Sequence, residues 1–435
     1  MKLFIYSCLL ISLNAAHAFD FTPNELIVKL KPGFSLPKLQ NVKSIQNLFE
    51  NTYVLRTANL DKLEKSLKNN PAIIYTERNH RSERNALPLP TSSTISQHKI
   101  ALSDSQFNDP LIGKVWSFLD ANQNGVSVNN AYKEYGTSNT SPVIVAVVDT
   151  GVDTKHEDLK DVIWVNAAEI PNNGIDDDNN GYIDDINGIN TLVRDADGKA
   201  TMNIKDTHSH GTHVSGTIGA KQNNRIGIAG IASNVKIMGL RTVPNDGDET
   251  DIDVAEAFIY AARNGARLIN CSFGKSSNEG RQLIPDTLKY IAEKYGVLVV
   301  AAAGNDSKNI DTSPTYPASF KNDNLLIVAS TTSSGSISYF SNYGEINVDV
   351  AAPGSNVYST APGNSYQSMS GTSMATPTTV GVAAEILSHN PELTFSQLKD
   401  VLIKSVTKID SFKNKMISGG RIDLLKGLEL AKTIK

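Results

Sequence analysis

Short apolar runs alternate with amphipathic segments along most of the chain from about residue 105 onward. The runs, rich in Val, Ile, Leu and Ala, lie at 142–149, 235–241, 267–273, 296–305 and 324–330. Between them, 254–265 and 285–296 have apolar residues at helical spacing and end in the Gly that is typical just past a helix. Apolar runs separated by helices predict an α/β fold, with a mostly parallel sheet covered by helices on both faces.

The first part of the chain has a different pattern. Three segments alternate like strands and a fourth has helical spacing; they lie at 25–31, 51–57, 72–78 and 60–69, respectively. A polar stretch rich in Ser and Pro follows and predicts an exposed linker. We therefore expect a small α+β unit over 19–81, a linker over 82–104 and a large α/β unit over 105–435.

Residues 1–18 have the features of a secretory signal peptide. Lys2 precedes a largely apolar run that ends at Leu13, and Ala16-His17-Ala18 supplies the small-x-small pattern of a cleavage site. The run is too short to remain as a membrane span, and no later stretch reaches about 18 apolar residues. We expect a mature chain without a membrane anchor, exported to the periplasm or the medium.

Composition and charge narrow the function classes. The chain is 40% hydrophobic and 20% charged with a net charge of −4, so no basic excess points to nucleic acid. Residues 19–81 carry ten Lys and Arg against six Asp and Glu, whereas 82–435 carry 30 against 39. Opposite charges favour docking of the small unit on the large one; a solvated charge bias without such a meaning is the alternative.

Three residues with complementary chemistry stand at the ends of predicted elements. Asp149 ends an apolar run, His210 precedes a small-residue helix, and Ser373 opens a helix that reaches about Leu387. A hydroxyl nucleophile needs an imidazole to take its proton and a buried carboxylate to hold that imidazole in the correct tautomer. These residue types therefore predict a nucleophilic hydrolase.

The motifs around these residues are VVDTGVD, HSHGTHVSG and SGTSMATP. With them the chain resembles the subtilisin-like serine proteases over roughly 105–435. The resemblance implies a subtilisin-like fold, in which Asp149 orients His210, His210 is general base and acid, and Ser373 is the nucleophile. It also implies that Asn305 and the Ser373 N–H form an oxyanion hole. Relatives usually carry His-Val-Ala-Gly where this chain has Thr378-Thr379-Val380-Gly381, which predicts altered helix packing.

The resemblance extends to the substrate cleft and to the small unit. It places a peptide substrate against Ser272, Phe273, Gly274, Ala303 and Gly304, with Thr315 near the floor of the primary pocket. The small unit is similar to the family's propeptide, an intramolecular inhibitor that assists folding and is removed by self-cleavage, here between His80 and Gln106. We expect a monomeric secreted endopeptidase that is made as a zymogen and acts on proteins or peptides.

An acidic loop predicts a calcium site. Residues 161–193 hold seven Asp and Glu and no Lys or Arg, and 176–185 fits D-x-[DN]-x-[DN]-G, a spacing that wraps a hard cation with oxygen ligands. The expected ligands are Asp176, Asp178, Asn180, the Tyr182 carbonyl and Asp184. Asn187 replaces the bidentate Glu of a full EF-hand, and a solvated acidic loop is the alternative. The less charged segment 120–125 predicts a turn.

The family resemblance implies a second calcium site. Its ligands would be Asp158, Asn224 and the carbonyls of Gln222, Ile226 and Ile228. Cys8 leaves with the signal peptide and only Cys271 remains, so no internal disulfide can form, and bound metal is another route to stability.

Two other functions stay as alternatives. An esterase or lipase would need G-x-S-x-G and the chain order Ser, Asp, His, whereas Asp149 comes first here. A catalytically silent binding module would be expected to have a damaged triad or oxyanion residue, and labelling with a serine-reactive fluorophosphonate distinguishes it from an enzyme.

Overall fold

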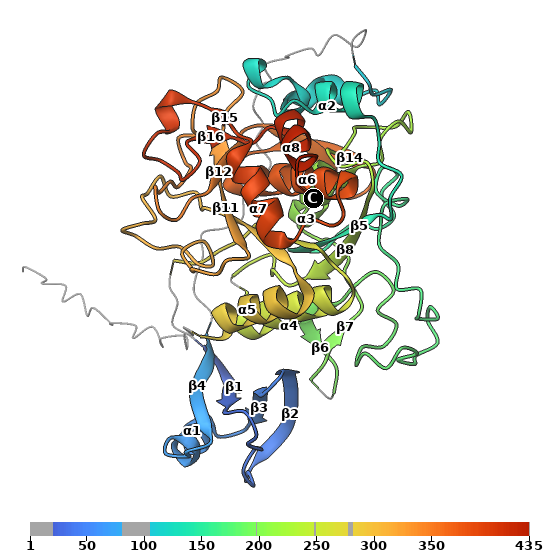
Figure 1. Ribbon diagram of the computed structural model, residues 1–435. Coiled ribbons are helices and arrows are strands. Elements are labelled where there is room, and N and C mark those ends of the chain that lie inside the picture. The colour runs from blue at the N-terminus through green and yellow to red at the C-terminus, as the bar shows by residue number, and fades with distance from the viewer. Residues whose placement is uncertain (1–20, 81–104, 197, 248, 277–281, 435) are drawn as a thin grey trace, which may run out of the picture.

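A large, mostly parallel sheet organises the second unit (Figure 1). The computed structural model describes residues 21–80, 105–196, 198–247, 249–276 and 282–434. The sheet has ten strands in the order β15-β16-β12-β11-β10-β9-β5-β8-β6-β7. Its central strands, all parallel to their neighbours, are β5 (Val143–Asp149), β8 (Val235–Arg241), β9 (Leu268–Cys271), β10 (Leu298–Ala302), β11 (Leu325–Thr331) and β12 (Val350–Pro353). Short strands form the edges: β6 (Asn190–Arg194), β7 (Ala200–Thr201), β15 (Thr407–Lys408) and β16 (Gly420–Arg421).

Helices cover both faces of this sheet. One face carries α2 (Val128–Tyr135), α3 (His210–Gly219), α6 (Thr372–His389), α7 (Phe395–Lys404) and α8 (Leu424–Ala431), and the other carries α4 (Asp251–Arg263) and α5 (Leu283–Tyr295). Along β5, Val145 and Val147 pack in the first core, whereas Ala146 and Val148 pack in the second. Both faces of the strand are therefore buried, and the predicted α/β fold is confirmed.

The ends of the helices follow the sequence signals. The backbone of Gly296, directly after α5, has φ 68°, and that of Gly265, just past α4, has φ 82°, the left-handed region that Gly adopts most readily. Within α6, the side-chain hydroxyls of Thr378 and Thr379 donate to the carbonyls four residues earlier at 3.0 and 3.1 Å. The two threonines are thus accommodated inside the buried helix.

Shorter elements connect these layers. A separate hairpin of β13 (Val357–Ala361) and β14 (Ser365–Met369) precedes α6, and single helical turns occur at Ile112–Lys114, Trp116–Phe118, Ala121–Gln123 and Asp410–Phe412. The segment 120–125 forms a turn, as expected. The buried guanidinium of Arg421 donates to two backbone carbonyls of this turn, those of Gly125 and Ala121, at 3.0 and 2.7 Å. No helix among the described residues is long and apolar enough to cross a membrane.

The small unit is an antiparallel sheet with one helix. Its strands have the order β2-β3-β1-β4 and are β1 (Phe21–Leu30), β2 (Val42–Phe49), β3 (Thr52–Thr57) and β4 (Ile73–His80), with α1 at Leu60–Leu67. Leu26, Val28 and Leu55 pack against α1. Ile27 and Val54 point to the opposite face and join the core formed by α4 and α5. The small unit therefore lies against these two helices (Figure 1).

Candidate active site

Four predicted site residues lie at the ends of elements that meet at one edge of the large sheet. Asp149 is the last residue of β5, Asn305 follows β10, His210 begins α3, and Ser373 is the second residue of α6. In an open parallel sheet, ligands bind in the crevice outside the carboxyl ends of the strands. The fold therefore gathers residues that are far apart in sequence at the edge where such crevices form.

His210 and Asp149 form a buried pair. His210 Nδ1 lies 2.8 Å from Asp149 Oδ1 and 3.0 Å from Oδ2, and the two side chains are 0% and 1% exposed. The backbone N–H of Thr150 also donates to Asp149 Oδ1 at 2.7 Å, which fixes the carboxylate. A carboxylate at Nδ1 keeps the proton on that nitrogen and leaves Nε2 as the acceptor, the tautomer that a general base requires.

The glycine after His210 permits this approach. A Cβ on Gly211 would lie 2.1 Å from the Gly151 carbonyl oxygen and 3.1 Å from Asp149 Cβ. No side chain larger than hydrogen fits without moving the backbone. Gly211 thus lets the start of α3 reach the end of β5.

Ser373 stands at the start of α6 with its hydroxyl turned to a backbone carbonyl. Its Oγ donates to the Ser272 carbonyl oxygen at 2.9 Å. Among the described residues, His210 Nε2 is buried and has no hydrogen-bond partner. The structure therefore joins Asp149 to His210, while a bond between Ser373 and His210 requires the hydroxyl to leave the Ser272 carbonyl. Such bonds are often loose in structures without substrate and tighten when it binds.

A proline in α6 accounts for a second contact between Ser373 and Ser272. Pro377 has no N–H, so the carbonyl four residues earlier, that of Ser373, lacks its helical partner. The Ser272 hydroxyl donates to this carbonyl at 3.0 Å. The loop after β9 and the start of α6 are thereby tied together.

The amide oxygen of Asn305 is held by Thr372, the residue before Ser373. Its Oδ1 accepts from the backbone N–H and the hydroxyl of Thr372 at 2.8 and 2.9 Å. Because the amide oxygen is held in this way, the Nδ2 group is directed away from Thr372. The preceding Gly304 has φ 102°, and a Cβ there would lie 2.4 Å from Asn342 Nδ2.

The predicted substrate-binding segments lie close to one another. Lys275, directly after Gly274, exchanges two backbone hydrogen bonds with Tyr316, of 2.9 and 2.8 Å. Thr315 is buried, and a Cβ on either Gly274 or Gly304 would lie 3.5 Å from its Cγ2. Thr315 therefore sits between the two segments, where the resemblance places the floor of the primary pocket.

Two other reactive side chains near the site are held inactive by burial. Cys271 is fully buried, and desolvation raises the pKa of its thiol well above the usual value. Burial, with a smaller contribution from His210, lowers the pKa of His213 to about 3, and its Nε2 lies 3.0 Å from the Val357 carbonyl oxygen. His213 is thus neutral near pH 7.

The acidic loop gathers a different set of carboxylates from the predicted one. Glu169, Asp178 and Asp185 place one oxygen each within 4.8 Å of one another. Of the predicted ligands, only Asp178 belongs to this cluster; Asn180 borders it, donating to Asp178 and Asp185 at 3.0 and 2.9 Å.

The other predicted loop ligands have different partners. The Asp176 carboxylate accepts from the backbone N–H groups of Asn180 and Gly181, and that of Asp184 from Asn173 and Gly174. Tyr182 is predicted to bind through its backbone carbonyl, and its side chain donates to Glu256 at 3.0 Å. Glu169 was not predicted because it lies seven residues before the motif. Asp185 was not predicted because the motif spacing places the ligand at Asp184 instead.

The second predicted metal loop surrounds two buried aspartates. Asp158 accepts from Asn224 Nδ2 at 2.7 Å and from the Ile228 N–H at 2.9 Å. Asp109, which the sequence analysis missed, accepts from the N–H groups of Asn223 and Asn224 at 3.0 and 3.2 Å. Burial raises the pKa of Asp158 to about 6, and the nearby charge of Asp109 adds to this rise.

The remaining predicted ligands of this loop are its backbone carbonyls. The Ile226 N–H donates to Asn224 Oδ1 at 2.7 Å, which shapes the turn. The Gln222 side chain points to the neighbouring segment, where it donates to the carbonyls of Gly230 and Ile231. Its backbone carbonyl remains the predicted ligand, and its Oε1 is buried without a hydrogen-bond partner among the described residues.

Comparison with known proteins identifies the family. Residues 140–419 match the model of the subtilase family, Peptidase S8. The chain is 34% identical over 362 residues to subtilisin-like protease 1 of Plasmodium berghei, covering 79% of this chain and 58% of that protein. It is 32% identical over 361 residues to a thermophilic serine proteinase of Bacillus sp. (strain AK1), covering 82% of this chain and 72% of that protein. The chain belongs to the subtilase family.

A solved structure agrees with this assignment. A protease from Pseudoalteromonas arctica superposes with a TM-score of 0.59 at 29% identity, and the match covers 75% of this chain and all of that one. The resemblance inferred from the three motifs is thus confirmed at the level of family and fold. The chain spans little more than half the length of the Plasmodium relative.

Proposed function

We propose that the protein is a secreted serine endopeptidase that hydrolyses peptide bonds through an acyl-enzyme on Ser373. The observation that carries this proposal is the buried pair of Asp149 and His210, 2.8 Å apart, at the sheet edge that also receives the start of α6. Family membership supports the same chemistry.

The reaction uses these groups in sequence. Ser373 Oγ attacks the peptide carbonyl carbon while His210 Nε2 takes its proton, and the Asp149 carboxylate stabilises the imidazolium. Asn305 Nδ2 and the Ser373 N–H donate to the resulting oxyanion. The C–N bond then breaks as His210 passes the proton to the leaving amine, and water hydrolyses the acyl-enzyme by the reverse path.

The variant Asn305→Ala tests the oxyanion donor. We expect kcat to fall about 10²–10³-fold, the range found when this donor is removed from a subtilisin, with little change in KM because the donor acts on the transition state. Asn234, whose amide donates to Thr140 at the other end of the strands, provides a control in which Asn→Ala keeps kcat. A kcat within twofold of wild type for Asn305→Ala would contradict the assignment.

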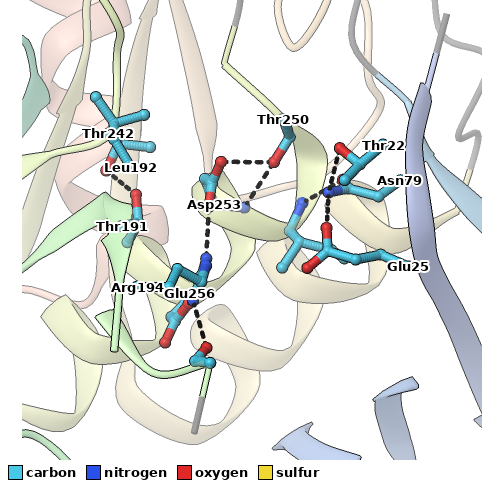
Figure 2. Close-up of polar contacts among 12 residues, drawn as sticks. Thr22, Glu25, Asn79, Thr191, Leu192, Arg194, Thr242, Thr250, Asp253 and Glu256 are labelled. Carbon is cyan, nitrogen blue, oxygen red and sulfur yellow. Dashed lines mark hydrogen bonds and ion pairs between the residues drawn. The ribbon is translucent and has the colours of Figure 1, made fainter. Parts of the chain in front are cut away.

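The small unit acts as a propeptide that docks on the helix N-termini of the catalytic unit. The Asn79 Oδ1 accepts from the Ile252 N–H in the first turn of α4 at 3.1 Å, and Glu77 accepts from the N–H groups of Gln282 and Leu283 at the start of α5. Glu25 holds the Asn79 amide in this orientation by accepting from its Nδ2 at 2.7 Å (Figure 2).

A second set of contacts joins β2 of the small unit to α4 and α5. Gln46 donates to the buried carboxylate of Glu256 at 3.1 Å, Leu48 O accepts from Arg263 at 3.0 Å, and the Phe49 ring stacks on Tyr290. Arg194 pairs with both Glu256 and Asp253 (Figure 2). Its positive charge offsets part of the acidic face to which Gln46 binds.

These contacts support the assignment of the small unit as the propeptide in the predicted domain organisation. The chain comprises a signal peptide (1–18), the propeptide (19–81), a linker with the processing site (82–104) and the catalytic unit (105–435). The signal peptide, the linker and residues 19, 20 and 81 of the propeptide lie outside the described residues. Secretion and self-processing rest on the sequence pattern and on the family resemblance.

Docking of the propeptide is expected to weaken as pH rises. Burial raises the pKa of Glu77 from 4.5 to about 8, although its two backbone donors lower it. A carboxyl with a raised pKa in the docked state supports docking fully below about pH 4.5 and loses that support as pH rises to about 8. We expect the cleaved propeptide to dissociate at least about tenfold faster at pH 8 than at pH 5. Size-exclusion chromatography at successive times measures the fraction of propeptide released.

The control for this effect is Glu77→Gln, which does not titrate. Its single amide oxygen can accept from only one of the two N–H groups, which donate to different oxygens of Glu77, so docking is expected to be weaker at both pH values. In this variant the difference between the two pH values is expected to shrink to less than about threefold. Equal pH dependence in both proteins would show that another group is responsible.

The acidic loop (161–193) and the loop 222–228 beside Asp158 are proposed calcium sites. Their donors are carboxylate, amide and carbonyl oxygens, the ligands that calcium prefers, and the buried carboxylates of Glu169 and Asp185 crowd together beside Asp178. In the second loop, Asp109 and Asp158 are both fully buried. A bound cation would neutralise these charges and thereby stabilise the fold.

Removal of calcium is expected to lower the melting temperature. Saturation of one site at about 100 times Kd contributes about 2.7 kcal/mol, which corresponds to a shift of about 4 °C for a unit of about 330 residues. Thermal melts with calcium and with EGTA measure this difference in melting temperature. Asp178→Asn should reduce the difference, and an identical melt of wild type in both buffers would count against both sites.

A further inference from the structure

A buried carboxylate that the proposed reaction does not use lies four positions before His210. Asp206 is buried, and its Oδ1 accepts from the backbone N–H groups of His208 and Ser209 at 2.9 and 3.0 Å. Its Oδ2 accepts from the N–H and the hydroxyl of Thr212 at 3.0 and 2.6 Å. Because a buried carboxylate is stable only when its oxygens are hydrogen-bonded, Asp206 is fixed firmly against the first turn of α3.

Asp206 caps α3 in place of the residue that directly precedes the helix. Ser209 is the N-cap residue, yet among the described residues its side chain makes no capping hydrogen bond. Its backbone has φ 92°, a left-handed conformation that is costly for a residue other than glycine and persists only where surrounding contacts hold it. Asp206 therefore supplies the cap and holds the residue before His210 in a strained conformation.

A hydroxyl group extends the influence of this carboxylate to the other side of His210. Thr150 Oγ1 donates to Asp206 Oδ1 at 3.0 Å and accepts from the Gly211 N–H at 3.0 Å. Thr150 directly follows Asp149, and its own N–H donates to the Asp149 carboxylate at 2.7 Å. The backbone before His210 is thus bound to Asp206 directly, and the backbone after it is bound through Thr150.

We propose that Asp206 is a positioning residue that fixes the His210 imidazole against the Asp149 carboxylate. The inference rests on the proposed peptidase function and assigns it one further residue. Asp206 acts through the backbone on both sides of His210 and through Thr150, the neighbour of Asp149. The bond of 2.8 Å between His210 and Asp149 requires such fixation, because a misplacement of about 1 Å can cost about 10²-fold in rate.

The variant Asp206→Asn tests the proposal. The amide has nearly the shape of the carboxylate, but its NH₂ group cannot accept from the N–H groups that face one of the two oxygens. We expect kcat to fall about 10²-fold. KM is expected to change less than about threefold, since the segments proposed to bind substrate keep their contacts. Steady-state kinetics of the processed protein measure both constants.

A pair of variants at Thr150 tests the same connection without altering a charge. Thr150→Val keeps the shape of the side chain but lacks the hydroxyl between Asp206 and the Gly211 N–H, whereas Thr150→Ser keeps that hydroxyl. We expect kcat to fall about tenfold in Thr150→Val and to stay within about threefold of wild type in Thr150→Ser. If Asp206→Asn does not fold, equal kcat values of the two Thr150 variants overturn the inference.

A second buried capping carboxylate provides the matched control. Asp423 is the buried N-cap of α8, where it accepts from the Lys426 N–H at 3.4 Å and from the Thr407 hydroxyl at 2.8 Å. It follows β16, which four strands of the sheet separate from β5. Asp423→Asn should affect stability only and leave kcat within about twofold of wild type. An equal loss of kcat in Asp206→Asn and Asp423→Asn would overturn the inference.

A measurement without catalysis separates the inference from the proposed function. The proton that His210 Nδ1 shares with Asp149 gives a separate signal far downfield in the proton NMR spectrum. We expect this signal in Ser373→Ala and expect it to broaden or move upfield in Ser373→Ala/Asp206→Asn. An unchanged signal would overturn the inference even if wild type is an active peptidase. If the signal responds but wild type cleaves neither casein nor peptides, the peptidase function fails while the placement of His210 by Asp206 stands.

Discussion

Replacement of Ser373 by Ala is expected to lower kcat about 10⁶-fold, the loss found when the nucleophile of a subtilisin is removed. Without the hydroxyl no acyl-enzyme can form, and the oxyanion hole and substrate binding alone leave only a small residual acceleration. The same variant should leave the precursor uncut between His80 and Gln106, because self-cleavage uses the same nucleophile. Casein hydrolysis and mass spectrometry of the intact chain measure the two effects.

A serine on the same helix provides the control for this variant. Ser388 lies near the other end of α6, where its hydroxyl donates to the Glu385 carbonyl at 2.8 Å. Ser388→Ala should retain activity and processing. Efficient maturation of Ser373→Ala in a strain without other proteases would mean that the nucleophile has been wrongly assigned.

Asp149→Asn is expected to reduce kcat about 10⁴-fold while the fold stays intact. An amide in place of the carboxylate can donate to His210 Nδ1, which moves the imidazole proton to Nε2. The imidazole then cannot accept the proton of Ser373, and no negative charge stabilises the imidazolium. Steady-state kinetics at pH 7 measure the loss, and an unchanged melting temperature excludes unfolding as its cause.

Asp161→Asn provides the comparison for the loss of an Asp charge. Asp161 is exposed and its carboxylate forms a surface ion pair with Lys160, so its replacement should leave kcat within about twofold. In the double variant Asp149→Asn/Ser373→Ala, the loss should equal that of Ser373→Ala alone, because the residues act as a unit. A kcat of Asp149→Asn within tenfold of wild type would contradict the proposed role.

The sheet and its helices could be predicted because each apolar run is buried on both faces. Val145 to Val148, for example, alternate between two cores, so the run contains no polar position. In contrast, β2 was not predicted. Most of its residues alternate between partial and full exposure, and its burial depends on docking against α4 and α5, which no local pattern reveals.

The candidate site was predictable in identity but not in geometry. Motifs place Asp149, His210 and Ser373 at element ends, yet the Ser373 hydroxyl bonds to the Ser272 carbonyl. Side-chain torsions of this kind depend on neighbours that are about 100 residues away in sequence. Asp109 was missed for the same reason, because only the fold brings it to the loop of Asp158.

The ion pair of Lys275 and Asp251 is a further example. The two residues belong to different elements, 24 positions apart, and neither forms part of a motif. Their partnership depends on how α4 begins beside the end of β9.

Labelling with a tagged fluorophosphonate tests the central claim most directly, since the reagent bonds only to a serine whose hydroxyl is activated. The account predicts that the processed protein is labelled on the tryptic peptide containing Ser373, that labelling is at least about a thousandfold slower in Asp149→Asn, and that it is lost after heat denaturation. A folded, processed protein without label at Ser373 would show that the three side chains do not act together, and the peptidase assignment would fail.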